Sequence, residues 1–450
     1  MNRPSRQSLE QGSAITAAAV SAAILTILAA GLLSYMATEG RLTSRSHAWK
    51  HALHLAEAAA EIGVAEFTYQ YTQGGSGFTT GRSWTDQGGG SYTKTVSNFT
   101  SNAGATIGHL TINATGIGTS TPQITGIGTA TASVGTQNVS RAVRIGFAAN
   151  SLFPMGIISK NTITMSGNAS VDSYDSSDST KSTSGLYDSS KKQANGNIGT
   201  TSTSANSITL SGNADVYGTA STGTGGTMSM SGNAQVGPTF VGGDRADTST
   251  EAETSGWLTD SGPTAPPDVS LPSGLSSASS LGNINDDVTI SGGDWQASQI
   301  NLSGNDTITI SGTVRIYVTG SSSISGNAEI QINAGGSLEV YAAGSVSIAG
   351  NGVNNDATTP DKNMWYGLSS CTSWSMSGNA DWVGTVYAPQ ATLTCSGNGD
   401  ASGAFVASTI TISGNGEYHY DEALQDFTGS SSYSVASWQE LRYSGGTWVP

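Results

Sequence analysis

The chain has 450 residues, of which Ser, Thr and Gly fill 182, while only 11% are charged and 36% are hydrophobic. Ordinary soluble domains carry about 25% charged residues, so this composition argues against a helical or α/β enzyme and favours many short polar strands and turns. The net charge of −15 is small for this length, which argues against a disordered polar chain.

The charge is unevenly distributed along the chain. Residues 1–50 hold five Lys/Arg and two Asp/Glu, whereas residues 151–450 hold eight Lys/Arg against 26 Asp/Glu. An acidic body repels polyanions, so we expect no nucleic-acid partner and no anionic lipid bound to that body. Two cysteines, Cys371 and Cys395, exclude a disulfide scaffold and a cysteine-rich zinc site, and leave open whether they are bridged.

The N-terminal region predicts a membrane span. No charged residue occurs from Gln11 to Thr38, and the apolar part, Ser13–Ala37, exceeds the roughly 20 residues that a span requires. Basic residues flank it on both sides, so they do not fix its orientation. A cleaved secretory signal is the alternative, but the apolar run is longer than such a signal needs.

Helical periodicity continues beyond the apolar run. Apolar or small residues recur three or four apart at Trp49, Leu53, Ala56, Ala60, Gly63 and Phe67. This spacing predicts an amphipathic face that packs on a sheet. The sequence thus predicts one helix over residues 13–70, roughly 85 Å long, whose first half spans a membrane or enters a helical bundle.

The segment from Glu10 to Phe67, with Leu55-Ala56-Glu57-Ala58-Ala59 near its end, resembles the N-terminus of PilX-type pilus assembly proteins. The resemblance implies a leader over residues 1–12, processing between Gly12 and Ser13, and other pilin-like subunits as partners. It also implies a single-pass protein of the bacterial inner membrane with an exported body. The chain has Ser13 and Ala17 where typical pilins carry Phe and Glu.

Two further segments precede residue 151. Residues 71–90 are rich in glycine and are predicted to form a linker. Residues 91–150 contain short alternating runs separated by Gly and Asn, which predict a small antiparallel β meander.

A repeated turn dominates the rest of the chain. Ser-Gly-Asn occurs eight times, and the turn asparagines are Asn168, Asn213, Asn233, Asn305, Asn327, Asn379, Asn398 and Asn415. With three close variants, the residue before each turn is apolar, which gives the predicted core stack Met165, Leu210, Met230, Ile290, Leu302, Ile310, Ile324, Ile348, Met376, Cys395 and Ile412. Apolar residues two positions apart followed by Gly-Asn predict a short strand and a sharp turn.

The repeats are too short to bury a core alone, so they must stack. We therefore predict a mainly β protein, with a parallel β-solenoid over residues 151–425, an asparagine ladder along one edge and a proline-rich excursion at 238–281. An antiparallel sandwich is the rival fold. The aromatic tail, residues 426–450, is predicted to cap the open last coil. Segments such as Gly384–Leu393 and Glu417–Leu424 also resemble the solenoid often fused to PilX-like anchors.

Little in the sequence indicates chemistry. His47, His51 and His54 share one helix face, but no HExxH glutamate lies between them, and a polar helix face is favoured over a zinc site. The segment with Asp172, Asp175 and Asp178 does not fit a calcium loop, so a solvated loop is favoured and no cofactor is expected.

A catalytic site is weakly indicated. His419, Asp421 and Glu422 form the tightest cluster, and Asp215, Asp381, Asp400 and Glu417 follow turns, with almost no Lys or Arg beside them. The sequence therefore favours a membrane-anchored, pilin-like structural or adhesive surface protein that binds a glycan or protein. The alternatives are a polysaccharide-acting enzyme and a self-assembling solenoid scaffold.

Overall fold

The structure is a computed structural model that describes residues 7–71, 77–100, 106–119, 121–131, 138–241, 244–349, 352–355, 359–378 and 382–450. The chain forms two compact units, one of residues 1–150 with 430–450 and one of residues 151–429. The protein is mainly β with one long N-terminal helix, as the sequence predicts.

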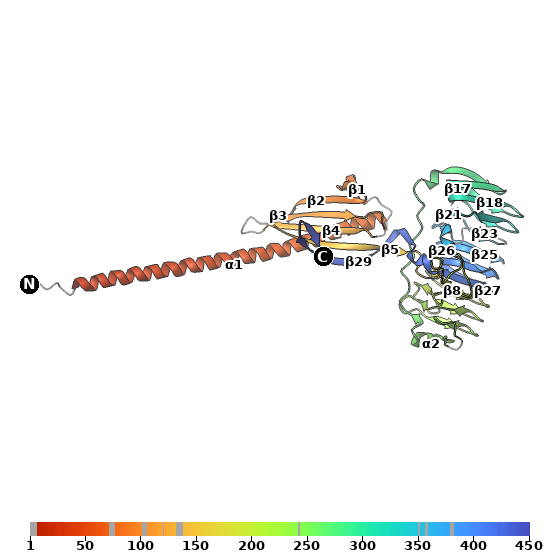
Figure 1. Cartoon of the computed structure of the whole chain (residues 1–450), viewed down its shortest axis with the longest axis horizontal. Coiled ribbons are helices and arrows are strands. Elements are labelled where there is room, and N and C mark those ends of the chain that lie inside the picture. The colour runs from red at the N-terminus through yellow and green to blue at the C-terminus, as the bar shows by residue number, and fades with distance from the viewer. Residues whose placement is uncertain are drawn as a thin grey trace, which may run out of the picture. The chain divides into compact units, whose positions relative to one another are not determined.

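The first unit combines this helix with an antiparallel sheet (Figure 1). The helix α1 covers Gln7–Tyr71, and a 3-10 turn covers Thr80–Arg82. The strands, in sheet order, are β1 (Thr85–Gly88), β2 (Ser91–Thr100), β3 (Thr106–Thr115), β4 (Gln123–Thr131), β5 (Asn138–Ser151), β29 (Thr428–Ser444) and β30 (Thr447–Val449). Strands β1 to β5 pair antiparallel in succession, which agrees with the predicted meander.

Small residues let α1 lie directly against β4. Ala52, Ala56, Ala59 and Ala60 are fully buried there. A Cβ on Gly126 would lie 2.3 Å from the carbonyl oxygen of Ala56, and one on Gly128 would lie 2.2 Å from that of Ala52. The glycines are therefore required for this close approach of strand and helix. The predicted helix face is right at Ala56, Ala60 and Phe67, but Trp49 is 43% exposed.

Two expectations about the ends of this unit are wrong. The predicted linker at 71–90 contains Phe78 and Trp84, which are both buried in the core beneath the sheet. The predicted cap at 426–450 instead forms β29, which lies beside β5 in the antiparallel sheet, and β30, which pairs with β29 at the edge. β29 adds to the sheet here because the edge beside β5 is open to it.

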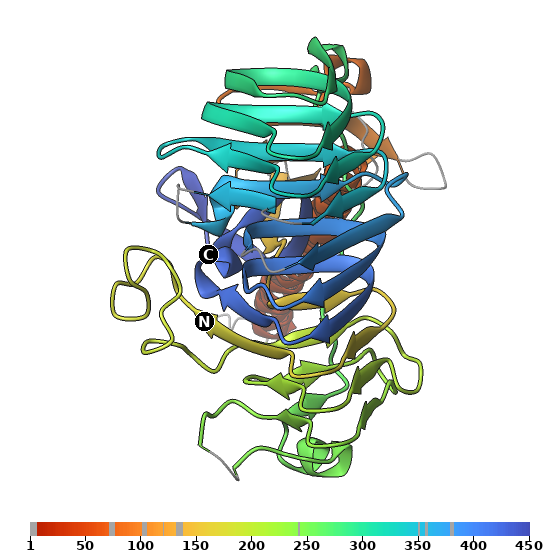
Figure 2. The same ribbon diagram turned by 90° about the vertical axis from the view of Figure 1, so that its right-hand side faces the viewer.

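The second unit is a stack of coils held by parallel strand pairing (Figure 2). Each coil runs through three faces, which we call C, A and B in chain order. Face C holds β6 (Ile157–Ser159), β9 (Ile198–Thr200), β12 (Ala220–Ser221), β15 (Leu258–Thr259), β16 (Ser279–Ile284), β21 (Ser337–Ala342) and β24 (Asn363–Gly367). Face A holds β7 (Ile163–Met165), β10 (Ile208–Leu210), β13 (Met228–Met230), β19 (Ser322–Ile324), β22 (Val346–Ile348) and β25 (Ser373–Gly378).

Face B follows the Ser-Gly-Asn turns. It holds β8 (Ser170–Tyr174), β11 (Asp215–Val216), β14 (Gln235–Val236), β20 (Glu329–Ile332), β23 (Gly352–Asn355) and β28 (Glu417–Asp421). Four long strands bend around corners and contribute to more than one face: β17 (Val288–Leu302), β18 (Thr307–Val318), β26 (Trp382–Gly397) and β27 (Ala401–Gly414). The shorter β16 also passes from face C to face A, where Ile284 pairs with Ile300. Parallel pairing in register, rather than an antiparallel sandwich, builds this unit.

The coils are not stacked in chain order. The last coil pairs with the first on all three faces, through β27 with β6, β27 with β7, and β28 with β8. We call this junction the seam. Figure 2 shows it as the contact between blue coils and the yellow coil, with teal coils above and green coils below. From the seam the chain descends to β15, and residues 260–278 then carry it to the opposite end.

The predicted excursion at 238–281 therefore has a different form. It includes the short helix α2 (Ser249–Thr254) and strand β15, which belongs to the stack because it pairs with β12. Only residues 260–278 cross between the two ends. They run along face C, where the Tyr387 hydroxyl donates to the Pro267 carbonyl oxygen at 2.9 Å and Val269 bridges to Leu368.

Candidate functional site

The first half of α1 has the properties of a membrane span. By length and composition it is able to cross a bilayer, since an 18-residue window has a mean hydropathy of 2.2 and none of it is buried in the fold. Large apolar side chains such as Ile24 and Leu28 are more than half exposed. Gly12 and Ser13, the predicted processing site, lie within α1.

The predicted core-stack residues lie inside the second unit. Met230 and Met376 are half-buried, and the other nine are buried. They do not form one column, however. Ile290 pairs with Ile310 on face B, whereas the others lie on face A, as in the series Met376, Cys395, Ile412 and Met165. The variants Ser291-Gly-Gly and Ser311-Gly-Thr are thus turns out of face B.

The predicted asparagine ladder is confirmed, and it crosses the seam. Side-chain amides connect Asn233 to Asn213, Asn213 to Asn168, Asn168 to Asn415, and Asn415 to Asn398, at 2.6–2.9 Å. Asn327 donates to Asn305 at 3.2 Å in other coils, and Asn379 lies outside the described residues. At the seam the adjoining glycine admits no side chain, since a Cβ on Gly167 would lie 2.4 Å from the carbonyl oxygen of Gly414.

Face A presents an uncharged row of polar side chains beside this ladder. In register across the stack, the row consists of Asn301, Ser323, Ser347, Ser375, Thr394, Thr411, Thr164, Thr209 and Ser229. None of these side chains is buried. Parallel strands lie about 4.8 Å apart, so the row is roughly 38 Å long. We call it the hydroxyl row.

A buried polar network lies at the seam on face B. His419 and Asp172 are register partners, and the Nδ1 atom of His419 lies 2.6 Å from an Asp172 carboxylate oxygen. The Tyr187 hydroxyl donates to the other carboxylate oxygen at 2.8 Å, and its ring stacks on His419 with centroids 3.4 Å apart. Both His419 and Asp172 side chains are at most 5% exposed, so the network is closed to a substrate.

The neighbouring carboxylates of Asp421 and Glu422 bind residues 173–195, which we call the covering loop because it lies over this network. Asp421 accepts hydrogen bonds from the Ser176 amide and hydroxyl, at 2.9 and 2.6 Å. Burial raises the pKa of Asp421 above its ordinary value. Glu422 accepts from Ser173 and Asn195 and lies 3.3 Å from Lys181. The cluster predicted around His419 therefore exists, but its bonds attach residues 173–195 to the last coil.

The side chains of Asp172, Asp175 and Asp178, which the sequence places near one another, do not converge on a common calcium site. Asp172 is buried at the seam, which contradicts the expected solvated position. Asp175 accepts from Ser177, and Asp178 accepts from Thr180, in local turns of the loop. Within the described part of the chain, no group of three His, Cys, Asp or Glu residues is arranged to hold a metal ion. The helix histidines His47, His51 and His54 are exposed.

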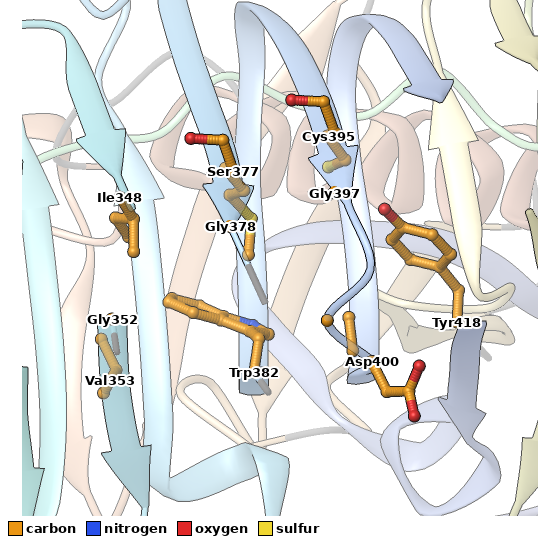
Figure 3. Close-up of a pocket in the computed structure, with 14 residues that line it drawn as sticks. Ile348, Gly352, Val353, Ser377, Gly378, Trp382, Cys395, Gly397, Asp400 and Tyr418 are labelled. Carbon is orange, nitrogen blue, oxygen red and sulfur yellow. The ribbon is translucent and has the colours of Figure 1, made fainter. Parts of the chain in front are cut away.

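Figure 3 shows a small cavity inside the stack, between faces A and B. Its volume of about 50 Å³ has room for a few water molecules but not for a sugar ring. Trp382, Cys395, Asp400 and Tyr418 line it. Cys395 and Cys371 are both buried, unbridged thiols. Burial raises the pKa of Cys395 to about 12, so this thiol stays neutral and is no nucleophile near neutral pH.

Residues 244–427 match the model of a domain of unknown function, DUF7305. No curated protein matches the chain in sequence. The chain is similar to the competence-associated pilin ComZ from Thermus thermophilus, with 11% identity and a TM-score of 0.29, over 88% of this chain and 98% of ComZ.

A second similar structure is the DUF3494 domain of an ice-binding protein from Shewanella frigidimarina. It has 12% identity and a TM-score of 0.23, over 61% of this chain and 98% of that domain. Because both TM-scores are below 0.5, we draw no conclusion on fold or function from either structure.

Proposed function

We propose that this protein is a membrane-anchored, pilin-like structural or adhesive protein of a bacterial envelope, which displays an acidic β-solenoid on the exported side. The observation that carries the proposal is the division of α1. Its first half exposes large apolar side chains, while its second half is packed into a folded sheet through Ala52, Leu55 and Ala56. The apolar side chains on the first half of α1 are unfavourable in water, so this half needs a bilayer or a bundle of like helices around it.

The surface of the stack supports a display role. The hydroxyl row offers a long, uncharged array of donors and acceptors on a body that is otherwise acidic. Such a surface suits a periodic neutral ligand, and we propose a glycan of a cell or matrix surface. A protein partner, including other pilin-like subunits, is the alternative occupant.

Self-assembly by stacking of coil ends is less well supported. At one end of the stack, α2 packs against β13 and β15, and its Ala252 is fully buried in the common core. A covered end of this kind blocks pairing with another strand. The seam also removes the free edge that a last coil would otherwise expose.

We propose no catalytic role. A polysaccharide-acting enzyme is the competing function, and the pairing of His419 with Asp172 near Glu417 is the observation that favours it. The burial of both side chains opposes it, because general acid–base catalysis requires contact with the substrate. An assay of glycan cleavage tests this alternative. Cleavage by the native chain that is lost in both the Asp421→Asn and Glu422→Gln variants would establish the enzyme function instead.

Fractionation of cells and sheared filaments tests the anchor. We expect the full chain in the membrane or filament fraction and absent from the soluble pool. Replacement of Ile24 and Leu28 by Arg should release it, because charged side chains at the centre of a span cost several kcal/mol, about 2.5–3.5 each. The matched control, Ala at both positions, should stay with the membrane. A soluble native chain would overturn the proposal.

The N-terminal residue of the mature protein tests processing. Ser13 would indicate prepilin-type cleavage after Gly12, and Met1 would indicate a plain anchor.

For the ligand, we expect the chain to sediment with an insoluble neutral polysaccharide. A Thr394→Lys change in the hydroxyl row should weaken this, whereas Ser298→Lys, which is exposed elsewhere on the stack, should not.

A further inference from the structure

The first unit contains an open cavity of about 380 Å³ beside the helix. Its walls come from three elements: α1, the start of β5 and the C-terminal hairpin of β29 and β30. The lining residues used below are Arg45, Trp49, Arg141, Arg442, Tyr443 and Trp448. All belong to the first unit, in which ten Lys/Arg outnumber seven Asp/Glu, whereas the second unit has seven against 25.

The cavity has unpaired positive charge. Arg141 places its guanidinium 3.9 Å from the centre of the Trp49 ring and forms an ion pair with Glu440. Neither Arg45 nor Arg442 has an ion-pair partner among the residues that the structure describes. Two guanidinium groups therefore remain available to an anion, and their planar donors suit a phosphate.

The cavity lies close to the predicted membrane surface. Arg45 follows the end of the uncharged run at Thr38 by seven residues, which is about 10 Å along the helix. The headgroup layer extends roughly 5–8 Å beyond the hydrocarbon on each side. Side chains on a helix lean toward its N-terminus, so those of Arg45 and Trp49 lean back toward the bilayer.

The aromatic walls also suit this level. Tyr443 is 62% and Trp49 is 43% exposed, and the rings of Tyr443 and Trp448 pack edge to face with centroids 5.1 Å apart. Tyr and Trp concentrate at membrane–water interfaces, where one part of the ring is apolar and another is hydrated. Exposed aromatic rings beside free arginines are costly to leave in water and are stabilised at a lipid headgroup layer.

We propose that this cavity binds the phosphate of an anionic phospholipid headgroup in the leaflet from which α1 emerges. The inference rests on the proposed membrane anchorage. Binding there would fix the height and rotation of the helix–sheet unit on the bilayer. A second copy of the chain is the rival occupant, but its cavity has the same positive charge and would repel this one.

Native mass spectrometry of the full chain tests the site. The chain is released from detergent micelles that contain equal amounts of phosphatidylglycerol and phosphatidylcholine. We expect one phosphatidylglycerol molecule to be retained in preference to phosphatidylcholine. Arg45→Gln and Arg442→Gln should each weaken retention about fivefold, the usual contribution of one basic residue at an anionic surface.

Lys50→Gln is the matched control. Lys50 is an exposed cation on the same helix, one residue beyond Trp49, and does not line the cavity. It should retain lipid within about twofold of the native chain. Thermal unfolding that is unchanged in all three variants would show that they fold. Equal retention of both lipids, equal loss in Lys50→Gln, or a dimer that excludes lipid would overturn the headgroup site.

Flotation with phosphatidylcholine vesicles separates the two proposals. A chain that stays in the aqueous fraction would overturn the membrane anchor itself. A chain that floats with neutral vesicles yet shows no preference for phosphatidylglycerol would overturn the headgroup site alone. Inorganic phosphate that displaces the lipid at equal concentration would identify a small-anion site and also overturn the assignment to a lipid.

Discussion

The helix–sheet unit and the coil stack use the same small residues in different ways. In the helix–sheet unit, Gly126 and Gly128 let a helix touch a strand, and the first five strands pair with their neighbours in sequence. In the stack, glycines such as Gly167 and Gly414 turn the chain, and pairing connects distant coils. A composition rich in Gly, Ser and Thr therefore does not specify one architecture; the spacing of these residues does.

The largest expected effect concerns the helix–sheet contact. Gly126→Ala would place a Cβ 2.3 Å from one helix backbone atom, so strand or helix must move, and we expect a loss of about 3 kcal/mol. Calorimetry of the full chain should show a lowered transition for this unit and an unchanged one for the stack. Gly81→Ala, where the nearest atom is 3.9 Å away, is the control. A shift of both transitions would mean that the units unfold together.

The next effect concerns the seam. Asp172→Ala removes the acceptor of both His419 and Tyr187 and leaves the buried His419 without that partner, which should cost about 2 kcal/mol. Urea unfolding of the stack measures it. Asp178→Ala in the covering loop, where the carboxylate bonds only to its own turn, should change little. Equal effects would show that the seam network adds nothing to the stability of the stack.

A smaller effect is expected along the asparagine ladder. Asn168→Ala removes two amide bonds, to Asn213 and Asn415, and should cost about 1 kcal/mol because the ladder is exposed. Asn233→Ala, at the end of the same ladder, removes one bond and should cost about half as much. Urea unfolding compares the two variants. A larger loss of unfolding free energy in Asn233→Ala would mean that the hydrogen bonds of the ladder do not contribute additively.

The smallest effect is on pH dependence. Burial raises the pKa of Asp421, so the folded stack binds more protons than the unfolded chain, and stability falls as pH rises from about 3.8 through the raised pKa. Hydrogen bonds from Ser190 and Thr183 lower the pKa of Asp188 to about 2, so its contribution is lost as pH falls from 3.8 to 2. Urea unfolding from pH 2 to 7 should show that Asp421→Asn removes the first slope and Asp188→Asn the second.

Interchanged slopes would contradict this assignment of the two carboxylates. The two variants also compare a buried carboxylate, Asp421 in the last coil, with one at the surface, Asp188 in the covering loop. Asp421 is 1% exposed, and hydrogen bonds rather than a neighbouring charge shift the pKa of Asp188, so both slopes should persist at high salt.

Much of the coil geometry was predictable because it is local. An apolar residue, a polar residue, a second apolar residue and then Ser-Gly-Asn specify a strand and a turn within a few residues, as Ile208–Asn213 does. The asparagine ladder follows from stacking such turns in register. Ile290 and Ile310 were placed in the wrong column because a turn out of face B has the same local pattern as one out of face A.

The seam network was not predictable, although one signal was present. Asp172 and His419 both lie four residues after a turn asparagine, Asn168 and Asn415. Aligned repeats therefore place them at one register position. Their contact across 247 residues depends on the last coil lying on the first, and no local pattern encodes that.

The sequence by itself determined the apolar helix, the strand-and-turn unit and the acidic surface, since each depends on neighbouring residues. Only the tertiary structure decided the order of the coils and the place of the C-terminal strand. The stack is inserted between β5 and β29, which are neighbours in one sheet. Its first and last residues must therefore lie close together, so the chain enters and leaves at the seam, and residues 260–278 return it to the far end.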